Sequence, residues 1–152
     1  GFDHVEFANS HADTTTGHHL RWQLARNPDV ETLRGPNNAL PSDYTAPQAY
    51  RTAVPVELYS STYVAEQTQA YLDDHVANHA DQPFFIFASF PDPHHPFTPP
   101  GKYWDMYDPA DVKLPASFPA DGQPNNPLAQ WVHGKRGPDA ESRWGPGSVV
   151  PL

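Results

Sequence analysis

Two stretches of the chain carry a regular pattern of hydrophobic positions. The first, residues 60–80, has its less polar side chains at intervals of four, which places them on one face of a helix. These positions are Val64, Thr68, Leu72 and Val76. Serine and threonine at 60–62 supply an N-cap, and Pro83 follows closely. The pattern therefore predicts an amphipathic helix over residues 60–80.

Residues 84–90, Phe-Phe-Ile-Phe-Ala-Ser-Phe, form the second hydrophobic stretch, and a proline stands on each side of it. A short continuous apolar run is typical of a strand that is buried on both faces of a sheet. A helix followed by such a strand is a unit of an α/β sheet. No second buried strand is evident in the sequence. We therefore expect an α/β fragment, loop-rich outside these elements, whose sheet is completed by another chain.

The predicted strand leads into a stiff loop that carries acidic and imidazole side chains. Prolines 91, 93 and 96 restrict its backbone, and Asp92, His94 and His95 lie between them. Open α/β sheets bind their ligands beyond the carboxyl ends of the strands. This loop is therefore the first candidate for a functional site.

The amino-acid sequence of this region resembles that of a known enzyme family. Ser-Phe-Pro-Asp-Pro-His-His-Pro-Phe at 89–97, followed by Pro-Pro-Gly-Lys-Tyr-Trp-Asp-Met-Tyr-Asp-Pro at 99–109, is similar to the middle of a type I sulfatase of the arylsulfatase and choline-sulfatase type. These enzymes belong to the alkaline-phosphatase-like superfamily. The resemblance runs from about residue 1 to residue 118. It implies that His94 is a catalytic residue that contacts the sulfate group of an anionic ester, with His95 beside it as a second substrate-binding residue.

The resemblance also implies chemistry that this sequence does not contain. Type I sulfatases use a formylglycine made from the first residue of a Cys-x-Pro-x-Arg or Ser-x-Pro-x-Arg element, and they bind calcium through aspartates. The chain has no cysteine and no Ser-x-Pro-x-Arg, and the calcium ligands cannot be located in it. We therefore expect a truncated sulfatase-family segment, a sulfuric ester hydrolase by descent, without ordinary sulfatase activity by itself.

The histidine content leaves a second function open. Nine histidines occur in 152 residues, and four of them lie among three acids in the first 22 residues. Imidazole and carboxylate groups suit zinc and other divalent metals, so the chain could be a small metal-dependent hydrolase of phosphate or carboxylic esters. The candidate ligands are His11, His18, His19 and Asp92, together with the two loop histidines. A polar loop without a metal is the alternative interpretation.

Two further expectations concern pairs of histidines. Neighbouring residues of an extended loop point to opposite sides, so His94 and His95 should not share one ion. His75 and His79 lie one turn apart near the end of the predicted helix, where we expect a solvated helix end. The unfilled sheet suggests a third function, a non-catalytic module that forms homo-oligomers.

Composition limits the partners and the extent of the folded part. The net charge is −9 without any basic run, which argues against nucleic acid as a partner. No apolar stretch approaches ~18 residues, so no membrane span is expected. No signal peptide is visible, which favours a cytoplasmic protein, and the missing initiator methionine suggests a cut N-terminus. We expect a partial sulfatase-like domain over 1–118 and a Gly/Pro-rich tail over 119–152 that is disordered or non-native.

Overall fold

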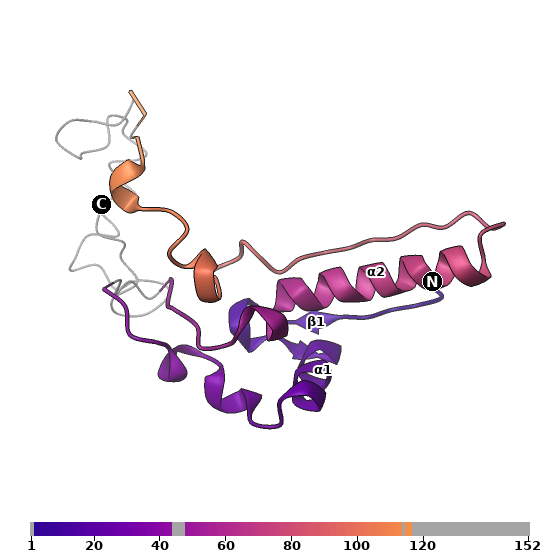
Figure 1. Ribbon diagram of the computed structural model, residues 1–152, viewed down its shortest axis with the longest axis horizontal. Helices are drawn as coiled ribbons and strands as arrows, with labels where there is room; N and C mark the ends of the chain where they lie inside the picture. Colours follow the sequence, from indigo (N-terminus) through magenta and orange to yellow (C-terminus); the bar gives the residue numbers. More distant parts are fainter. Residues whose placement is uncertain (1, 44–47, 114, 117–152) are drawn as a thin grey trace, which may run out of the picture.

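The structure is a computed structural model that describes residues 2–43, 48–113 and 115–116. The expected tail over 119–152 lies outside the described residues. Within these, the chain is a small mixed α/β protein with one two-stranded antiparallel sheet and two α-helices (Figure 1). The strands and helices are β1 (Ala8–Asn9), β2 (Thr16–Gly17), α1 (His18–Arg26) and α2 (Ser60–Asn78). Short 3₁₀ helices lie between and after them: Ala12–Thr14, Val30–Leu33, Pro36–Asn38, Val56–Leu58, Gly101–Tyr103 and Pro109–Asp111.

The hairpin of β1 and β2 leads directly into α1. Ala8 pairs with Gly17, and the backbone N–H of His18 donates to the carbonyl of Phe7 at 3.0 Å. Gly17 has a φ of 75°, and a Cβ atom at this position would lie 2.8 Å from Cε2 of Phe7. Glycine is therefore required where the second strand turns into the helix.

The hydrophobic core is small and is built from α1, two short 3₁₀ helices and the segments beside them. Its buried members are Val30, Val54, Leu58 and Tyr59, and Leu20, Trp22 and Leu33 pack against them. Two buried polar residues of α1 hold this core to the segment before α2. Nε2 of Gln23 donates to the carbonyl oxygen of Leu58 at 2.7 Å, and Nε2 of His19 lies 3.1 Å from the same oxygen.

A buried carboxylate fixes the irregular middle of the chain. Asp13 is 1% exposed, and its Oδ1 accepts a hydrogen bond from the Tyr50 hydroxyl at 2.5 Å. Its Oδ2 accepts from the Thr52 hydroxyl at 2.5 Å and from the backbone N–H of Gly35 at 3.2 Å. Arg34 adds a bond from Nε to the carbonyl of Asp13 at 2.9 Å. Because a buried charge requires such partners, this cluster orders segments that contain little regular structure.

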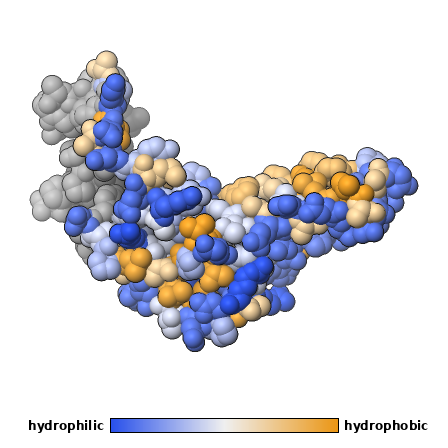
Figure 2. Space-filling model, viewed as in Figure 1, coloured by the Kyte–Doolittle hydropathy of each residue, from blue (hydrophilic) through white to orange (hydrophobic). Residues whose placement is uncertain are grey.

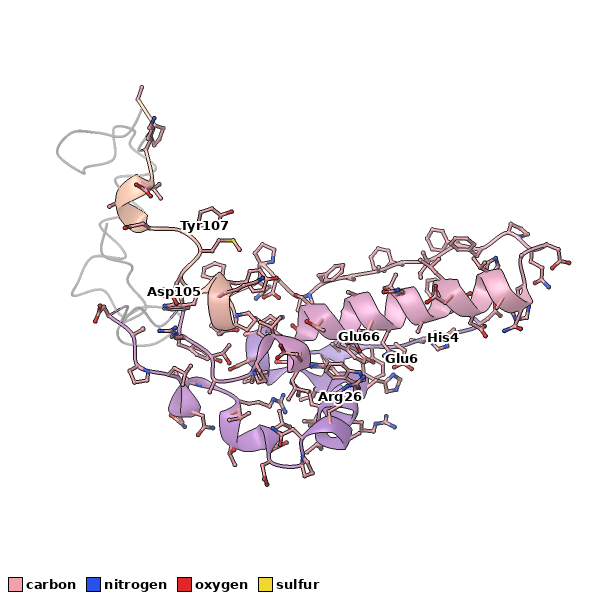
Figure 3. All side chains as sticks on the ribbon, in the orientation of Figure 1. His4, Glu6, Arg26, Glu66, Asp105 and Tyr107 are labelled. Atoms are coloured by element: carbon pink, nitrogen blue, oxygen red, sulfur yellow. The ribbon has the colours of Figure 1, made fainter. Side chains whose placement is uncertain are left out.

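Helix α2 starts against the core and extends away from it as an arm (Figure 1). Its first turns are tied to the N-terminal part of the chain. The Tyr63 hydroxyl donates to Glu6 at 2.7 Å, and Arg26 of α1 reaches Glu66 at 3.2 Å, a pair labelled in Figure 3. Toward the far end Val76 is 69% exposed. Among the described residues, no helix is both long and apolar enough to cross a membrane.

The predicted helix is confirmed, but the predicted buried strand is wrong. The helix ends at Asn78, close to the expected end at residue 80. The expected N-cap at 60–62 is wrong, because the N-cap is Tyr59 and no side chain caps the helix. Residues 84–90 run back along α2 in an extended conformation and belong to neither strand of the sheet (Figure 1). Phe85 and Phe87 are each 75% exposed. A strand needs neighbours for its backbone groups, and the described residues offer none along this segment.

The end of α2 also differs from the expectation, because His75 is not solvated. His75 is only 9% exposed, because the chain reverses after Asn78 and returns over it. Its ring lies 4.7 Å from the ring of Phe84, and its Nε2 lies 3.1 Å from the carbonyl oxygen of Gln82. A carbonyl can only accept, so Nε2 carries the proton and donates. His75 therefore fastens the returning segment to the helix.

Candidate functional site

The proline-rich loop after residue 90 is held at the start of α2 through Asp92. Its Oδ2 accepts from the Ser61 hydroxyl at 2.7 Å, and its Oδ1 accepts from the Tyr59 hydroxyl at 3.2 Å. A carboxylate at a helix N-terminus is also favoured by the helix dipole. The loop is therefore positioned by its acidic residue, and both oxygens of that residue already accept hydrogen bonds.

Tyr59 also contacts the residues that follow the loop. Its hydroxyl oxygen lies 2.8 Å from Oγ1 of Thr98, which is 1% exposed. Since the tyrosine donates its single proton to Asp92, the threonine hydroxyl donates to the tyrosine. Burial raises the pKa of Tyr59, and the Asp92 carboxylate raises it further, although the bond from Thr98 acts in the opposite direction. The phenol thus stays protonated and keeps its bond to Asp92.

His94 lies exposed at the tip of the anchored loop. Its backbone N–H donates to the carbonyl of Pro91 at 3.1 Å, which closes a turn. Its Nδ1 lies 2.6 Å from the carbonyl oxygen of His95. Because that oxygen can only accept, Nδ1 carries a proton, and in the neutral ring Nε2 holds the lone pair. Nε2 can therefore accept or bind a metal when neutral, and it donates a hydrogen bond only when the ring is an imidazolium.

The N-terminal turn brings a second histidine to this point. The ring of His11 stacks on the ring of His94, with centroids 3.8 Å apart and planes 11° from parallel. Ser10 and Ala12 on either side of it have φ values of 78° and 55°. Such angles strain residues with a side chain, and strained backbone gathers at sites where a side chain must be presented. The sequence named His11 as a partner of the loop histidines, and the structure places it against His94.

His95 lies on the same stack, so the two neighbouring rings do not point to opposite sides of the chain as expected. The rings of His94 and His95 are 4.6 Å apart and 25° from parallel. The expectation assumed an extended backbone, whereas the chain turns between Pro91 and His94. The loop and the N-terminal turn together present three stacked imidazoles, His11, His94 and His95, which we call the histidine stack.

The other predicted metal ligands are engaged elsewhere. His18 Nδ1 lies 2.8 Å from Oε2 of Glu6. His19 is fully buried, with Nδ1 on the hydroxyl of Thr15 and Nε2 donating to the Leu58 carbonyl. The pKa of His19 is lowered to about 4, mainly by burial and also by nearby Arg34, although the hydrogen bond to Leu58 acts in the opposite direction. His19 is therefore a neutral structural residue of the core.

The described part of the chain contains no group of three or more histidines and acids arranged to hold a metal ion. Parallel stacking explains why the histidine stack does not form one. The ring planes lie face to face, so their nitrogens do not converge on a common point.

Sequence reasoning missed the role of Asp13, which it treated as one acid of a polar segment. Its burial depends on Tyr50 and Thr52, whose separation from it along the chain hides the contact from any local pattern. Taken together, the described residues define a small mixed α/β protein with an exposed histidine stack on an anchored loop. Comparisons with protein-family models, with curated proteins and with solved structures find no match.

Proposed function

We propose that the chain is a segment of a sulfatase-family hydrolase whose histidine stack binds the anionic group of an ester. The observation that carries the proposal is the state of His94. Its Nδ1 is held by the His95 carbonyl, and the ring is exposed at the tip of a loop anchored by Asp92. An imidazolium in this position directs Nε2–H outward as a donor to an oxyanion.

Binding rather than turnover is the expected activity of this chain. Loss of one oxyanion donor from an intact site typically costs about 3 kcal/mol in transition-state stabilisation, so one donor supplies a minor part of catalysis. The sequence contains neither a formylglycine element nor a cysteine from which one is made. The segment should therefore bind sulfate and aryl sulfates weakly and leave the ester intact.

The test is a titration of the protein with sodium sulfate, followed by the NMR signals of the histidine side chains. We expect the signals of His94 and His11 to shift in a saturable way. Binding should strengthen in acid, because Nε2 donates only in the imidazolium form. His94→Ala should weaken binding about tenfold or more, the effect of losing one charge-assisted hydrogen bond.

His79→Ala is the matched control, since it removes an exposed histidine from the far end of α2. It should bind sulfate as the unaltered protein does. Equal loss of binding in both variants would mean that sulfate responds to charge in general, and the proposal would fail. Hydrolysis of an aryl sulfate that disappears with His94→Ala would overturn the statement that the chain lacks turnover.

The lone pair of neutral His94 favours a second candidate, a metal-dependent hydrolase of phosphate or carboxylic esters that uses zinc. The carbonyl-bonded Nδ1–H fixes the tautomer that a metal ligand needs. The two candidates predict opposite pH dependences. Metal binding strengthens as protons leave the imidazoles, whereas sulfate binding strengthens as they arrive. A zinc titration by calorimetry at two pH values therefore distinguishes them, with a stoichiometric ion lost in His94→Ala as the result that favours the metal.

A further inference from the structure

A row of exposed aromatic side chains lies along the arm. Its exposed aromatic side chains are Phe84 at 50%, Phe85 at 75%, Phe87 at 75% and Phe90 at 47%. Figure 2 shows hydrophobic residues gathered along the part of the molecule that α2 and the returning segment form. A continuous apolar surface of this kind marks a contact site in soluble proteins.

The backbone of residues 84–90 is also prepared for pairing. The segment is already extended, and all of its residues keep an N–H because the bounding prolines are at 83 and 91. Within the described part of the chain, no backbone hydrogen bond joins it to another segment. An exposed edge with unpaired donors and acceptors is a template for a further strand.

Its two faces differ. Phe84 packs on His75 of α2, and Ile86 is half-buried. Phe85 and Phe87 alternate with them and are the most exposed, although Phe85 also stacks with Phe2 at 6.4 Å. Over residues 84–87 this alternation is that of a strand with one face on a helix. The segment thus has a supported inner face, and its outer face and edge remain for a partner.

We propose that the partner is a second copy of this chain, whose residues 84–90 pair antiparallel with the same residues about a two-fold axis at Phe87. In this register Phe84 lies opposite Phe90, and Phe87 lies opposite its own copy. Cross-strand aromatic pairs stabilise such a contact. The inference rests on the extended segment alone and is independent of the histidine stack.

Charge limits a contact between two copies to this segment. The protein carries a net charge of −9, so two copies repel each other over most of their surface. Residues 82–91 contain no charged side chain, and Asp81 and Asp92 bound this neutral interval. A contact between identical surfaces must be compatible with itself, and an uncharged aromatic strand meets this condition. Its extended conformation also reduces the cost of ordering on association.

The experiment measures the mass of the full chain by sedimentation across a range of concentrations, for the unaltered protein and three variants. Phe87→Lys places two like charges opposite each other at the axis, and Phe87→Pro removes a backbone donor at the same point. Phe87 is exposed and makes no backbone bond to other described residues, so both variants should keep the helical circular dichroism signal. Val112→Lys is the control, because it adds the same charge at a valine that is 63% exposed outside the segment.

We expect a concentration-dependent dimer whose dissociation constant rises about tenfold or more in both Phe87 variants and is unchanged in Val112→Lys. Amide hydrogen exchange should slow at residues 84–90 in the dimer only. A monomer at all concentrations would overturn the proposal, as would assemblies larger than two. Slow exchange at 84–90 in a dilute monomer would show that the segment pairs with another part of the same chain. This result would also overturn the proposal.

Discussion

At the scale of single residues, His19 is the clearest case of a histidine used for structure. Its Nε2–H and the Gln23 amide both donate to the Leu58 carbonyl, and its Nδ1 accepts from Thr15. Protonation would leave the Thr15 hydroxyl without its acceptor and place a charge in a fully buried position. The ring is therefore neutral in the folded protein.

This arrangement predicts an acid-sensitive fold. The folded pKa of His19 is about 4 and lies below the ordinary value of 6.5. Between these values the unfolded chain binds the additional proton, so stability is intact above the ordinary value and falls as the pH decreases toward 4. Unfolding by urea at pH 7.5 and pH 5 should differ by about 2 kcal/mol through this residue.

His19→Gln should reduce this pH dependence, whereas His79→Gln at an exposed position should retain it. An equal slope in both variants would contradict the assignment of the acid sensitivity to His19.

The residue scale is also where the sequence predicted the candidate site in part. The order of prolines, Asp92 and the two loop histidines indicated the loop, and His11 was named as a partner. The buried roles of His19 and Asp13 could not be predicted, because their partners lie 39 residues away along the chain at Leu58 and Thr52. A local pattern contains no information about such distant contacts.

At the scale of elements, the junction between β2 and α1 depends on glycine for two separate reasons. Gly17 has a φ of 75°, and a Cβ atom there would meet the Phe7 ring at 2.8 Å and the Phe7 carbonyl oxygen at 3.0 Å. Gly35 has a similar φ of 80°, but the nearest atom to its Cβ would be Cγ2 of Thr14 at 3.6 Å. The second position therefore has the backbone strain without the close contact.

Gly17→Ala should consequently destabilise the protein more than Gly35→Ala. We expect about 1–2 kcal/mol for the strain at either site and a further ~1 kcal/mol or more for the contact at Gly17. Thermal unfolding of the two single variants measures this difference. Equal melting temperatures would mean that Phe7 moves aside without cost.

The two main elements show why one prediction was right and the other wrong. Helix α2 is specified by local features, namely its apolar row and Pro83 beyond its end, although the expected side-chain cap does not form. A strand is specified by its neighbours, and the sequence of 84–90 says nothing about where they are. The segment has the composition of a buried strand, yet the described residues leave it extended and exposed.

At the scale of the whole molecule, the net charge of −9 should control the proposed association. Two like-charged copies repel, and the proposed contact at 84–90 contains no ion pairs that salt would weaken. Raising sodium chloride from about 20 to about 200 mM should therefore tighten the dimer several-fold, because the salt screens the repulsion. Sedimentation at the two salt concentrations measures this change.

Phe87→Lys serves as the control for this measurement, because it should remain largely monomeric at both salt concentrations. Association that weakens in salt would instead indicate a contact between oppositely charged surfaces and would contradict the proposed register.

The hydrogen bonds that join α1 to the segment before α2 affect which substitutions this chain tolerates. His19 and Gln23 both bond to the oxygen of residue 58, which belongs to the main chain. No substitution at position 58 can remove that acceptor. A mutational scan should therefore find that position 58 requires only a side chain of suitable size, whereas positions 19 and 23 require hydrogen-bond donors. The link between α1 and this segment thus depends on the side chains of the two donors, because any amino acid at position 58 supplies the acceptor.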